Sequence, residues 1–559
     1  MSSPPPNSEP RIVGRHQRLV KRTVLVSALT LASRILGFVR EVLSAMLFGD
    51  RSGIYDAFIT AWRLPNLFRR FLGEGAISTA LQTRLTEVDA ERGDEAGRQL
   101  FLRTLGLAAI ALVVVCTLVM ALVAVAPDRL PILGWAWLGE DPGPVRELCL
   151  RLMPFVVLIC LAALCGGALQ VRGHFAAPAF APAVMNVWWI GMLVGVGVAY
   201  GWSAGELDAL QGAERHMEMA RVLAWGVLAA GAIQLLVHVP ALLRQGLLVR
   251  KADTPAGEPV RGAWDVFKSS APLAFGAAVY QINVMVDGLM AEGLLRNGGP
   301  AAHYYANRIQ QFPLALIAIA ATSAVFPSLK ALGHLGRKAE LRALHDRTQL
   351  GIAFLALPAS AGLLVLAPSM CSVLFEHGEY GPDGVQRMAS ALRMLGLALV
   401  PAGAVGLVSR CYYALDDFRT PVRVSAWMLL VNAGFNTLFV VGLKMDADGL
   451  ALGTALASWG NLLWLWPGLA RALGASGLEL EAPSRVGRML LASALAAGAA
   501  WAADHFLSEP LGPTLALCVA GPTGIGAYLG ATRLCGLSAK RLLRPREGPE
   551  SGLSARQGE

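Results

Sequence analysis

Apolar segments long enough to cross a bilayer follow one another along almost the whole chain. A helix needs about 20 mostly apolar residues to span the hydrocarbon core. Such segments lie at 23–48, 54–83, 104–126, 147–171, 178–200, 221–243, 265–295, 301–329, 348–367, 385–415, 420–443, 448–470, 486–507 and 512–535. The chain is 55% hydrophobic and 16% charged, which is far from the composition of a soluble protein. We therefore expect an all-α polytopic membrane protein with about 14 transmembrane helices.

The loops between these segments alternate in charge. If the N-terminus is cytoplasmic, Lys and Arg gather in the even-numbered loops and the odd-numbered loops are often acidic. Cytoplasmic loops carry an excess of Lys and Arg, so both termini are predicted to face the cytoplasm. The net charge of +9 then reflects basic loops rather than a nucleic-acid partner. Residues 1–22 read as a flexible basic cytoplasmic tail without a cleaved signal peptide, and 536–559 as a second cytoplasmic tail.

The sequence also repeats internally. The sixth segment, LAWGVLAAGAIQLLVHVPALLR, aligns without a gap with the twelfth, LALGTALASWGNLLWLWPGLAR. The fifth and eleventh segments, and the second and eighth, match in the same order. Chance similarity between apolar helices is the alternative. Parallel repeats with a site between them are a transporter architecture. We expect an N-lobe at 23–243, a C-lobe at 265–470 and a C-terminal helix pair at 486–535.

Charged residues inside the first segment need an explanation. At about 100° per residue, the polar and small positions fall in one wedge of about 120°, which predicts a helix with a wet side. The wedge contains Ser33, Arg34, Gly37, Arg40, Glu41 and Ser44. A charge at the bilayer centre costs at least ~2.5–3.5 kcal/mol, so these side chains need water or partners.

Arginines outnumber acids at this depth. The second segment adds Arg63, Arg69 and Arg70, and the eighth adds Arg308, against Glu41, Asp56, Glu74 and Asp287. A guanidinium binds phosphate oxygens in a bidentate manner, so the surplus favours an anionic ligand. Structural ion pairs between packed helices are the alternative, and Arg69 and Arg70 also fit residues that reach the membrane interface.

Several chemistries have no motif in this chain. It has no GxxxxGK[ST] phosphate loop, HExxH or GxSxG motif, and no carboxylate pair suited to glycosyl transfer. The eight cysteines form no CxxC pair and are interpreted as packing residues. The chain is therefore expected to be a transporter rather than an enzyme, without a cofactor.

Five stretches carry a family resemblance. SRILGFVREVL, YDAFITAWRLPNLFRRFLGEGAIS, PAFAPAVMN, YYANRIQQFP and DDFRTPV resemble the MurJ (MviN) family of lipid II flippases, within the multidrug/oligosaccharidyl-lipid/polysaccharide exporter superfamily. The resemblance implies two six-helix lobes with two extra helices. It also implies transfer of undecaprenyl-pyrophosphate-linked peptidoglycan precursor from the cytoplasmic to the periplasmic leaflet of the bacterial inner membrane.

The resemblance also implies site residues. The cavity arginines of the family fall on Arg34, Arg40, Arg69 and Arg308, with Glu41, Asp56 and Ser33 beside them. It further implies a lipid-linked muropeptide substrate, contact with membrane lipids, no nucleic-acid partner, a loose association with the cell-wall synthesis machinery and a monomer.

Three energy sources are compatible with the sequence: Na⁺, H⁺ and the membrane potential. The resemblance places a monovalent cation at Asp287 and Asp417, although Tyr413 and Ala433 depart from the pattern. Each of these three sources could drive transport by this chain. The alternative is that Asp287 pairs with an arginine and Asp417 caps the eleventh helix. Two other functions compete with a flippase: a cation-coupled exporter of drugs or oligosaccharide-lipids, and a membrane enzyme acting on polyprenyl-phosphate.

Overall fold

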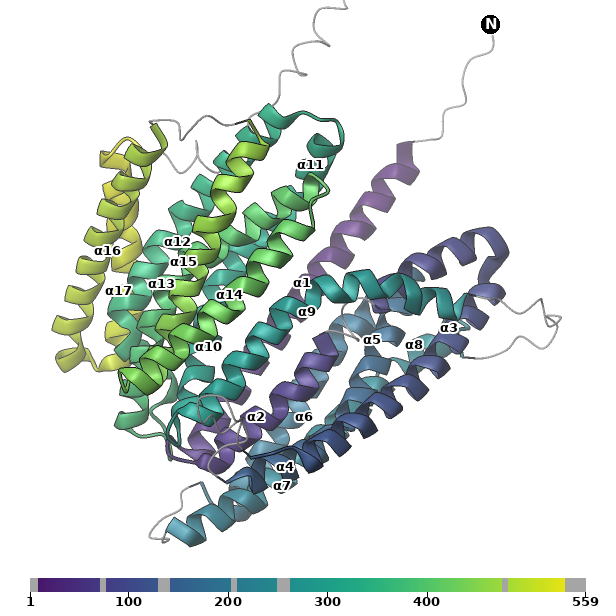
Figure 1. Ribbon diagram of the computed structural model, residues 1–559, viewed down its shortest axis with the longest axis horizontal. Helices are drawn as coiled ribbons and strands as arrows, with labels where there is room; N and C mark the ends of the chain where they lie inside the picture. Colours follow the sequence, from purple (N-terminus) through teal and green to yellow (C-terminus); the bar gives the residue numbers. More distant parts are fainter. Residues whose placement is uncertain are drawn as a thin grey trace, which may run out of the picture. The chain divides into compact units, whose positions relative to one another are not determined.

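The protein is helical throughout the part that the structure describes. This computed structural model describes the backbone of residues 9–70, 77–128, 141–202, 209–248, 262–474 and 481–537. Within these ranges there is no strand, which confirms the predicted all-α class (Figure 1). The helices are α1 (Glu9–Phe48), α2 (Gly53–Phe68), α3 (Ile77–Val125), α4 (Pro142–Leu152), α5 (Phe155–Val171), α6 (Ala176–Tyr200), α7 (Ala209–Leu236), α8 (Val239–Arg244), α9 (Ala263–Leu294), α10 (Gly299–Leu314), α11 (Ala320–His334), α12 (Lys338–Phe375), α13 (Pro382–Ala414), α14 (Arg419–Thr437), α15 (Ala447–Ala472), α16 (Glu481–Leu511) and α17 (Pro513–Leu534).

The helices reproduce the predicted number of segments. Two-residue turns separate α4 from α5 and α7 from α8. The π-helical turn η2 (Ala315–Ile319) connects α10 to α11, and the π-helical turn η3 (Leu438–Gly442) extends α14. Counting each of these as one gives the fourteen predicted segments among the described residues. Ten of them are long and apolar enough to cross a membrane, and α1, α2, α9 and α15 are the others. The chain is a multi-pass membrane protein.

Two helix ranges differ from the predicted spans. Helix α1 begins at Glu9 and extends beyond the predicted span at 23–48 on its N-terminal side, since Pro10 suits the first turn of a helix and no further proline follows in α1. The second predicted segment, 54–83, covers α2 and the first residues of α3. Helix α3 itself bends at Gly93, whose φ of 80° only glycine adopts readily.

The chain divides into two compact units. The first contains Met1–Ala302 and Phe375–Gly384, and the second contains His303–Leu374 and Val385–Glu559. The unit boundary therefore lies beyond α9, whereas the repeat places 265–294 at the start of the second lobe. Helix α9 packs against α2 and α3 of the first unit. The lobe boundaries given by the repeat stay a prediction.

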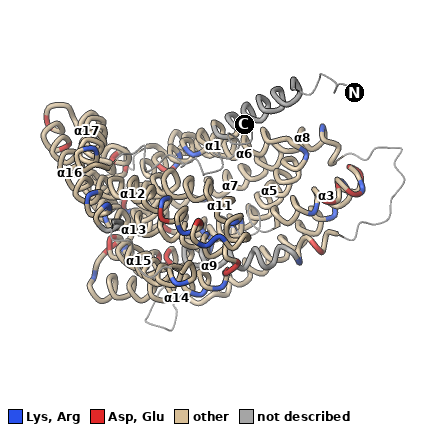
Figure 2. The backbone as a smooth tube through the Cα atoms, turned by 90° about the horizontal axis from the view of Figure 1, so that it is seen from above, with Lys and Arg blue, Asp and Glu red and all other residues tan. Residues whose placement is uncertain are grey.

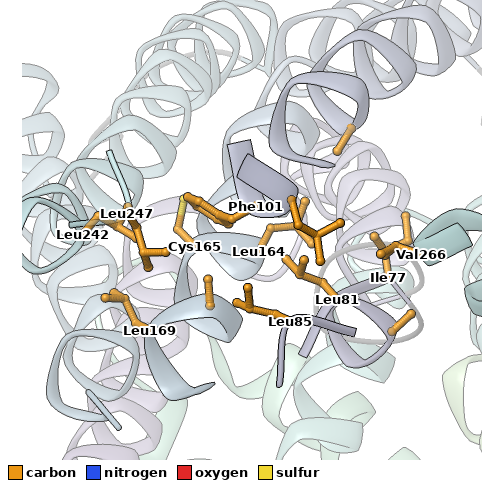
Figure 3. Packing of buried hydrophobic residues seen from close by; sticks show 14 of the residues in the cluster. Ile77, Leu81, Leu85, Phe101, Leu164, Cys165, Leu169, Leu242, Leu247 and Val266 are labelled. Carbon is orange, nitrogen blue, oxygen red and sulfur yellow. The ribbon is translucent and has the colours of Figure 1, made fainter. Parts of the chain in front are cut away.

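The first unit has an apolar core between α3, α5 and α8. Leu81 and Leu85 of α3 meet Leu164 and Leu169 of α5, and Leu242 of α8 closes the cluster (Figure 3). The fifth and sixth segments, α6 and α7, also pack on each other. In the second unit the equivalent pair, α14 and α15, does the same. Helices α16 and α17 lie side by side there (Figure 1).

The three prolines inside helices α12 and α13 of the second unit share one feature. A proline has no N–H, so the carbonyl four residues earlier loses its helical partner. In α12 and α13, three such carbonyls each accept a hydrogen bond from a side chain on another helix. For Pro358, the hydroxyl of Tyr528 donates to the carbonyl of Phe354 at 2.6 Å. For Pro368, Nε of Arg393 donates to the carbonyl of Leu364 at 3.2 Å. For Pro401, Nε1 of Trp459 donates to the carbonyl of Leu397 at 3.2 Å.

Candidate functional site

The charged wedge of α1 is partly buried against α6. Nη2 of Arg40 lies 2.6 Å from Oε1 of Glu41, and the two residues are only 7% and 4% exposed. Nη1 of Arg40 donates to Oδ1 of Asn186 on α6 at 3.3 Å. A buried charge requires a partner of opposite charge and further hydrogen bonds. The pair with Glu41 and the amide of Asn186 provide both.

Asn186 connects two turns of α1. Its Nδ2 donates to the carbonyl oxygen of Ser33 at 3.0 Å and to Oγ of Ser33 at 3.3 Å, while its Oδ1 accepts from Arg40. Gly37 lies between these turns, and a Cβ there would be 3.7 Å from Nδ2 of Asn186. An added Cβ would make only an ordinary van der Waals contact at that distance, so the close approach of α6 to α1 does not require glycine at this position.

The guanidinium of Arg40 also lies over an aromatic ring. Its Cζ is 4.3 Å from the ring centroid of Trp189, one turn beyond Asn186 on α6. Trp189 in turn packs edge-on against Trp62 of α2, with centroids 5.0 Å apart. A cation over an indole face gains about 0.5–2 kcal/mol, more when the pair is shielded from water. Arg40 is thus held by a carboxylate, an amide and an indole.

The other wedge positions have different surroundings. Arg34 is exposed, Ser33 is half-buried, and Ser44 is buried with its hydroxyl donating to the carbonyl of Arg40 at 2.9 Å. On the face of α1 that was predicted to contact water, Arg34 is exposed, whereas Arg40 and Ser44 are buried. Near Arg40, packing against α6 takes the place of water. Figure 2 shows that most of the helical backbone carries residues other than Lys, Arg, Asp and Glu.

Asp56 at the start of α2 has both carboxylate oxygens engaged. Oδ2 accepts from the N–H of Gly298 at 2.5 Å and Oδ1 from the N–H of Ala301 at 2.8 Å. Asp56 is 2% exposed. These two N–H donors lie at the start of α10, where N–H groups have no partner within the helix and a negative charge is favoured. In this structure Asp56 ties the start of α2 to the start of α10.

Further along α2, polar contacts point to α9. Oγ1 of Thr60 donates to Oε2 of Glu292 at 2.8 Å. The side chain of Arg63 lies against Gly288, where an added Cβ would overlap its Nη1. Arg69 donates through Nε and Nη2 to Oδ1 of Asn66, at 3.1 and 2.9 Å, one turn back on α2.

Arg308 belongs to the second unit. Its Nη2 donates to the hydroxyl of Tyr304 at 2.9 Å, and its Cζ lies 5.1 Å from the centroid of the same ring. Tyr304 precedes Arg308 by one turn of α10. The aromatic ring orients a guanidinium in a second place, as Trp189 does for Arg40.

The two aspartates with a predicted cation lie in different units. Asp287 is a half-buried residue of α9 in the first unit. Oδ1 of Asp417, in the second unit, accepts from the N–H groups of Arg419 and Thr420 at 3.1 and 3.0 Å. Burial raises the pKa of Asp417, but the hydrogen bonds from Thr420 and Arg419 outweigh it and lower the pKa below its ordinary value. Asp417 thus caps α14.

Metal ligands do not gather elsewhere in the described part of the chain. Among those residues, no group of three or more His, Cys, Asp and Glu side chains is arranged to hold a metal ion. All eight cysteines are free thiols, and six of them are buried.

Sequence reasoning missed the residues that hold the arginines. Asn186, Trp189 and Tyr304 were not predicted, and neither was Glu292. The strongest available signal was Asn186, a lone amide inside the apolar helix α6. A polar group in an apolar span requires a partner, so it points to a contact even when the sequence does not say with what.

Comparison with known proteins decides the family. The profile of the family described as "Lipid II flippase MurJ" matches residues 44–519. The chain belongs to the lipid II flippase MurJ family. It is 31% identical over 540 residues to a probable lipid II flippase MurJ of Vibrio cholerae, covering 94% of this chain and 98% of that protein. It is 30% identical to lipid II flippase MurJ of Burkholderia cenocepacia, covering 81% and 84%.

Solved structures agree on the fold of this MurJ family member. The structure described as lipid II flippase MurJ in an inward closed conformation matches with a TM-score of 0.71 at 20% identity, covering 93% of this chain and all of that one. An inward-facing multidrug transporter of the MATE family matches with a TM-score of 0.60 at 14% identity, over 81% and 99%. The family resemblance seen in the sequence motifs is confirmed.

Proposed function

We propose that this chain moves lipid II, the undecaprenyl-pyrophosphate-linked muropeptide, from the cytoplasmic to the periplasmic leaflet of the inner membrane. The observation that carries the proposal is family membership over nearly the full length, together with arginines inside membrane helices. The named relatives are flippases, which are transporters and not enzymes. An enzyme acting on polyprenyl-phosphate therefore has no support.

The arginines suit the part of lipid II that cannot cross a bilayer unaided. A pyrophosphate with its attached sugars is anionic and strongly hydrated, whereas the polyprenyl tail is soluble in hydrocarbon. Guanidinium groups bind phosphate oxygens with two parallel hydrogen bonds. Arg34, Arg40, Arg69 and Arg308 are the groups that we assign to the headgroup, with Ser33, Glu41 and Asp56 organising them.

The same arginines distinguish this function from that of the MATE-like exporter. The MATE structure shares the fold, and a fold alone does not define a function. Exporters of cationic or neutral substrates have no use for a surplus of intramembrane guanidinium groups. A flippase for an anionic lipid does.

Energy can come from the membrane potential. Outward movement of about two negative charges across ~100 mV, inside negative, is favoured by about 4–5 kcal/mol. A monovalent cation, Na⁺ or H⁺, bound near Asp287 and Asp417 is the second route. Asp287 is the residue to test first, because it lies inside helix α9 whereas Asp417 precedes α14, and an ionisable group inside a membrane helix is a functional candidate. Asp287→Asn should then remove any sodium dependence of transport, and an unchanged sodium response would exclude Asp287 as a ligand.

The loop charges support a cytoplasmic location for both termini. Membrane lipids surround the helices. The family resemblance, and not the loop charges, supports transport by one chain with at most a loose association with the cell-wall synthesis machinery.

Complementation tests the proposal. Arg34→Ala, Arg40→Ala and Arg308→Ala should each accumulate in the membrane at near-normal levels but fail to rescue a strain depleted of its lipid II flippase. Arg→Lys should rescue partly, because an ammonium lacks the two-pronged geometry of guanidinium. Loss of the Ala variants from the membrane would mean that the arginines hold the fold instead.

A further inference from the structure

Arg40 is held in a way that leaves part of its guanidinium available. An arginine has five N–H donors. Among the described residues, Asn186 and Glu41 accept from Nη1 and Nη2, and Trp189 covers one face of the group. Asn186 and Trp189 are neutral and lie on the same turn of α6. Glu41 is the one anion in this set of contacts.

We propose that Glu41 acts as a resident anion on Arg40, which the phosphate of the ligand displaces while Asn186 and Trp189 keep the guanidinium in position. This inference rests on the proposed function, because it assumes an anionic ligand at Arg40. Trp189 and Asn186 are positioning residues in this scheme. Glu41 regulates occupancy of the site.

The burial of the pair supports an exchange of partners. Arg40 and Glu41 are almost fully buried, and a buried arginine without a counter-charge is strongly destabilising. A site that releases its anionic ligand therefore needs a replacement anion. Glu41 is the next residue along α1, and its Oε1 lies 2.6 Å from Nη2 of Arg40. The empty site is thereby neutralised, and the ligand can leave.

The neutral side of the site explains why exchange does not disorder Arg40. Asn186 is itself oriented by two hydrogen bonds to Ser33, so its Oδ1 faces Nη1 of Arg40 whichever anion is bound. The ring of Trp189 packs edge-to-face against the rings of Trp62 and Phe58. Neither contact depends on Glu41. Both therefore persist when phosphate replaces the carboxylate.

Binding of farnesyl pyrophosphate to the full-length protein in lipid nanodiscs tests the scheme, with farnesol as the ligand without phosphate. Glu41→Gln removes the competing charge, so the probe should bind about tenfold or more tightly, the size expected for one charged hydrogen bond. Translocation of lipid II by the same variant should be slower, because release lacks the replacement anion. Trp189→Leu should weaken binding about threefold to tenfold, and Trp189→Phe less.

Matched variants separate this scheme from loss of structure. Glu147→Gln removes a carboxylate that pairs with Arg221 elsewhere in the first unit, and it should leave probe binding unchanged. If Glu41→Gln does not accumulate, Glu41→Asp provides the test, because its shorter side chain weakens the pair and should tighten probe binding by a smaller factor.

The outcomes distinguish this inference from the proposed function. Unchanged or weaker probe binding in the Glu41 variants, with binding lost in Arg40→Ala, would overturn the resident-anion scheme and leave the flippase site intact. Probe binding that is unaffected by Arg40→Ala would overturn both assignments at Arg40.

Discussion

The hydroxyl of Tyr528 on α17 donates to the carbonyl of Phe354 on α12 at 2.6 Å, and this carbonyl is the one that Pro358 leaves without a helical partner. The contact ties the C-terminal helix pair to α12. It also satisfies a backbone group in a region where no water would do so. The ring of Tyr528 packs against Phe354 as well, with centroids 5.2 Å apart.

Removal of that hydroxyl should destabilise the second unit. Tyr528→Phe keeps the ring but leaves the carbonyl of Phe354 unsatisfied, at a cost of about 0.6–2 kcal/mol. The melting midpoint of the purified protein should fall. Tyr200→Phe, at the more exposed end of α6, is the control and should leave the midpoint unchanged. Equal midpoints for both variants would show that the hydrogen bond contributes nothing.

The segment Phe375–Gly384 should depend on a close backbone contact. The N–H of Glu379 donates to the carbonyl of Met46 near the end of α1 at 2.9 Å, and a Cβ on Gly378 would lie 2.5 Å from that carbonyl oxygen. Gly378 also has a φ of 61°. Gly378→Ala should therefore displace the segment and change the rate at which a thiol reagent labels a cysteine placed at His377, which is exposed before the substitution as well.

Gly336 provides the matched control for this substitution. Its φ is 67°, but nothing lies within 4 Å of an added Cβ. Gly336→Ala should cost only the left-handed backbone penalty of about 1–2 kcal/mol and leave labelling at position 377 unchanged. Equal labelling of both variants would mean that the close approach to Met46 is not needed.

Asp417 should behave as a helix cap with a defined pH dependence. Asp417→Ala should lower stability by about 0.5–2 kcal/mol, whereas Asp417→Asn should be nearly neutral, because Asn caps helices equally well. The lowered pKa means that the charged cap stabilises the fold above its ordinary pKa and that this stability is lost as pH falls through the lowered value. The acid dependence of the melting midpoint should therefore be weaker in Asp417→Asn, and the remainder comes from other carboxyl groups with a lowered pKa.

A sodium titration of the same variant checks the cap against the cation site. If Asp417 only caps α14, sodium-dependent stabilisation, where present, should survive in Asp417→Asn. Its loss in that variant would make Asp417 a cation ligand.

Membrane topology follows from the loop charges alone. Reporter fusions after residues 250, 340 and 545 should be cytoplasmic, and fusions near 141, 210 and 380 should be periplasmic. Each fusion tests a different pair of helices. A single reporter on the opposite side would break the fourteen-helix topology.

The fold was largely predictable because the bilayer imposes a simple rule on each segment separately. Helix length and apolarity are local properties, so the fourteen segments follow from the sequence. The predicted segment 54–83 runs from α2 into α3, because apolarity alone does not mark where one helix ends and the next begins. Packing partners depend on contacts between distant parts of the chain. The sequence therefore did not show that α9 packs with α2 and α3 in the first unit, although the repeat assigns α9 to the second lobe.

The candidate site was predictable only in part, for a related reason. Periodicity placed Arg34, Arg40 and Glu41 on one face of α1, and Arg40 and Glu41 do lie together in the structure. It could not show that α6 covers part of that face. The rotation of α6 that brings Asn186 and Trp189 to Arg40 depends on packing between helices far apart in sequence.

The most direct measurement is the leaflet location of lipid II in cells depleted of their own flippase and supplied with this protein or its Arg40→Ala variant. A periplasmic enzyme that cleaves lipid II only in the outer leaflet reports the exposed fraction. We predict that the wild-type protein restores cleavage to the level before depletion and that Arg40→Ala, present in equal amount, does not. Cleavage that stays absent with the wild-type protein, or that is fully restored by the variant, would contradict the account.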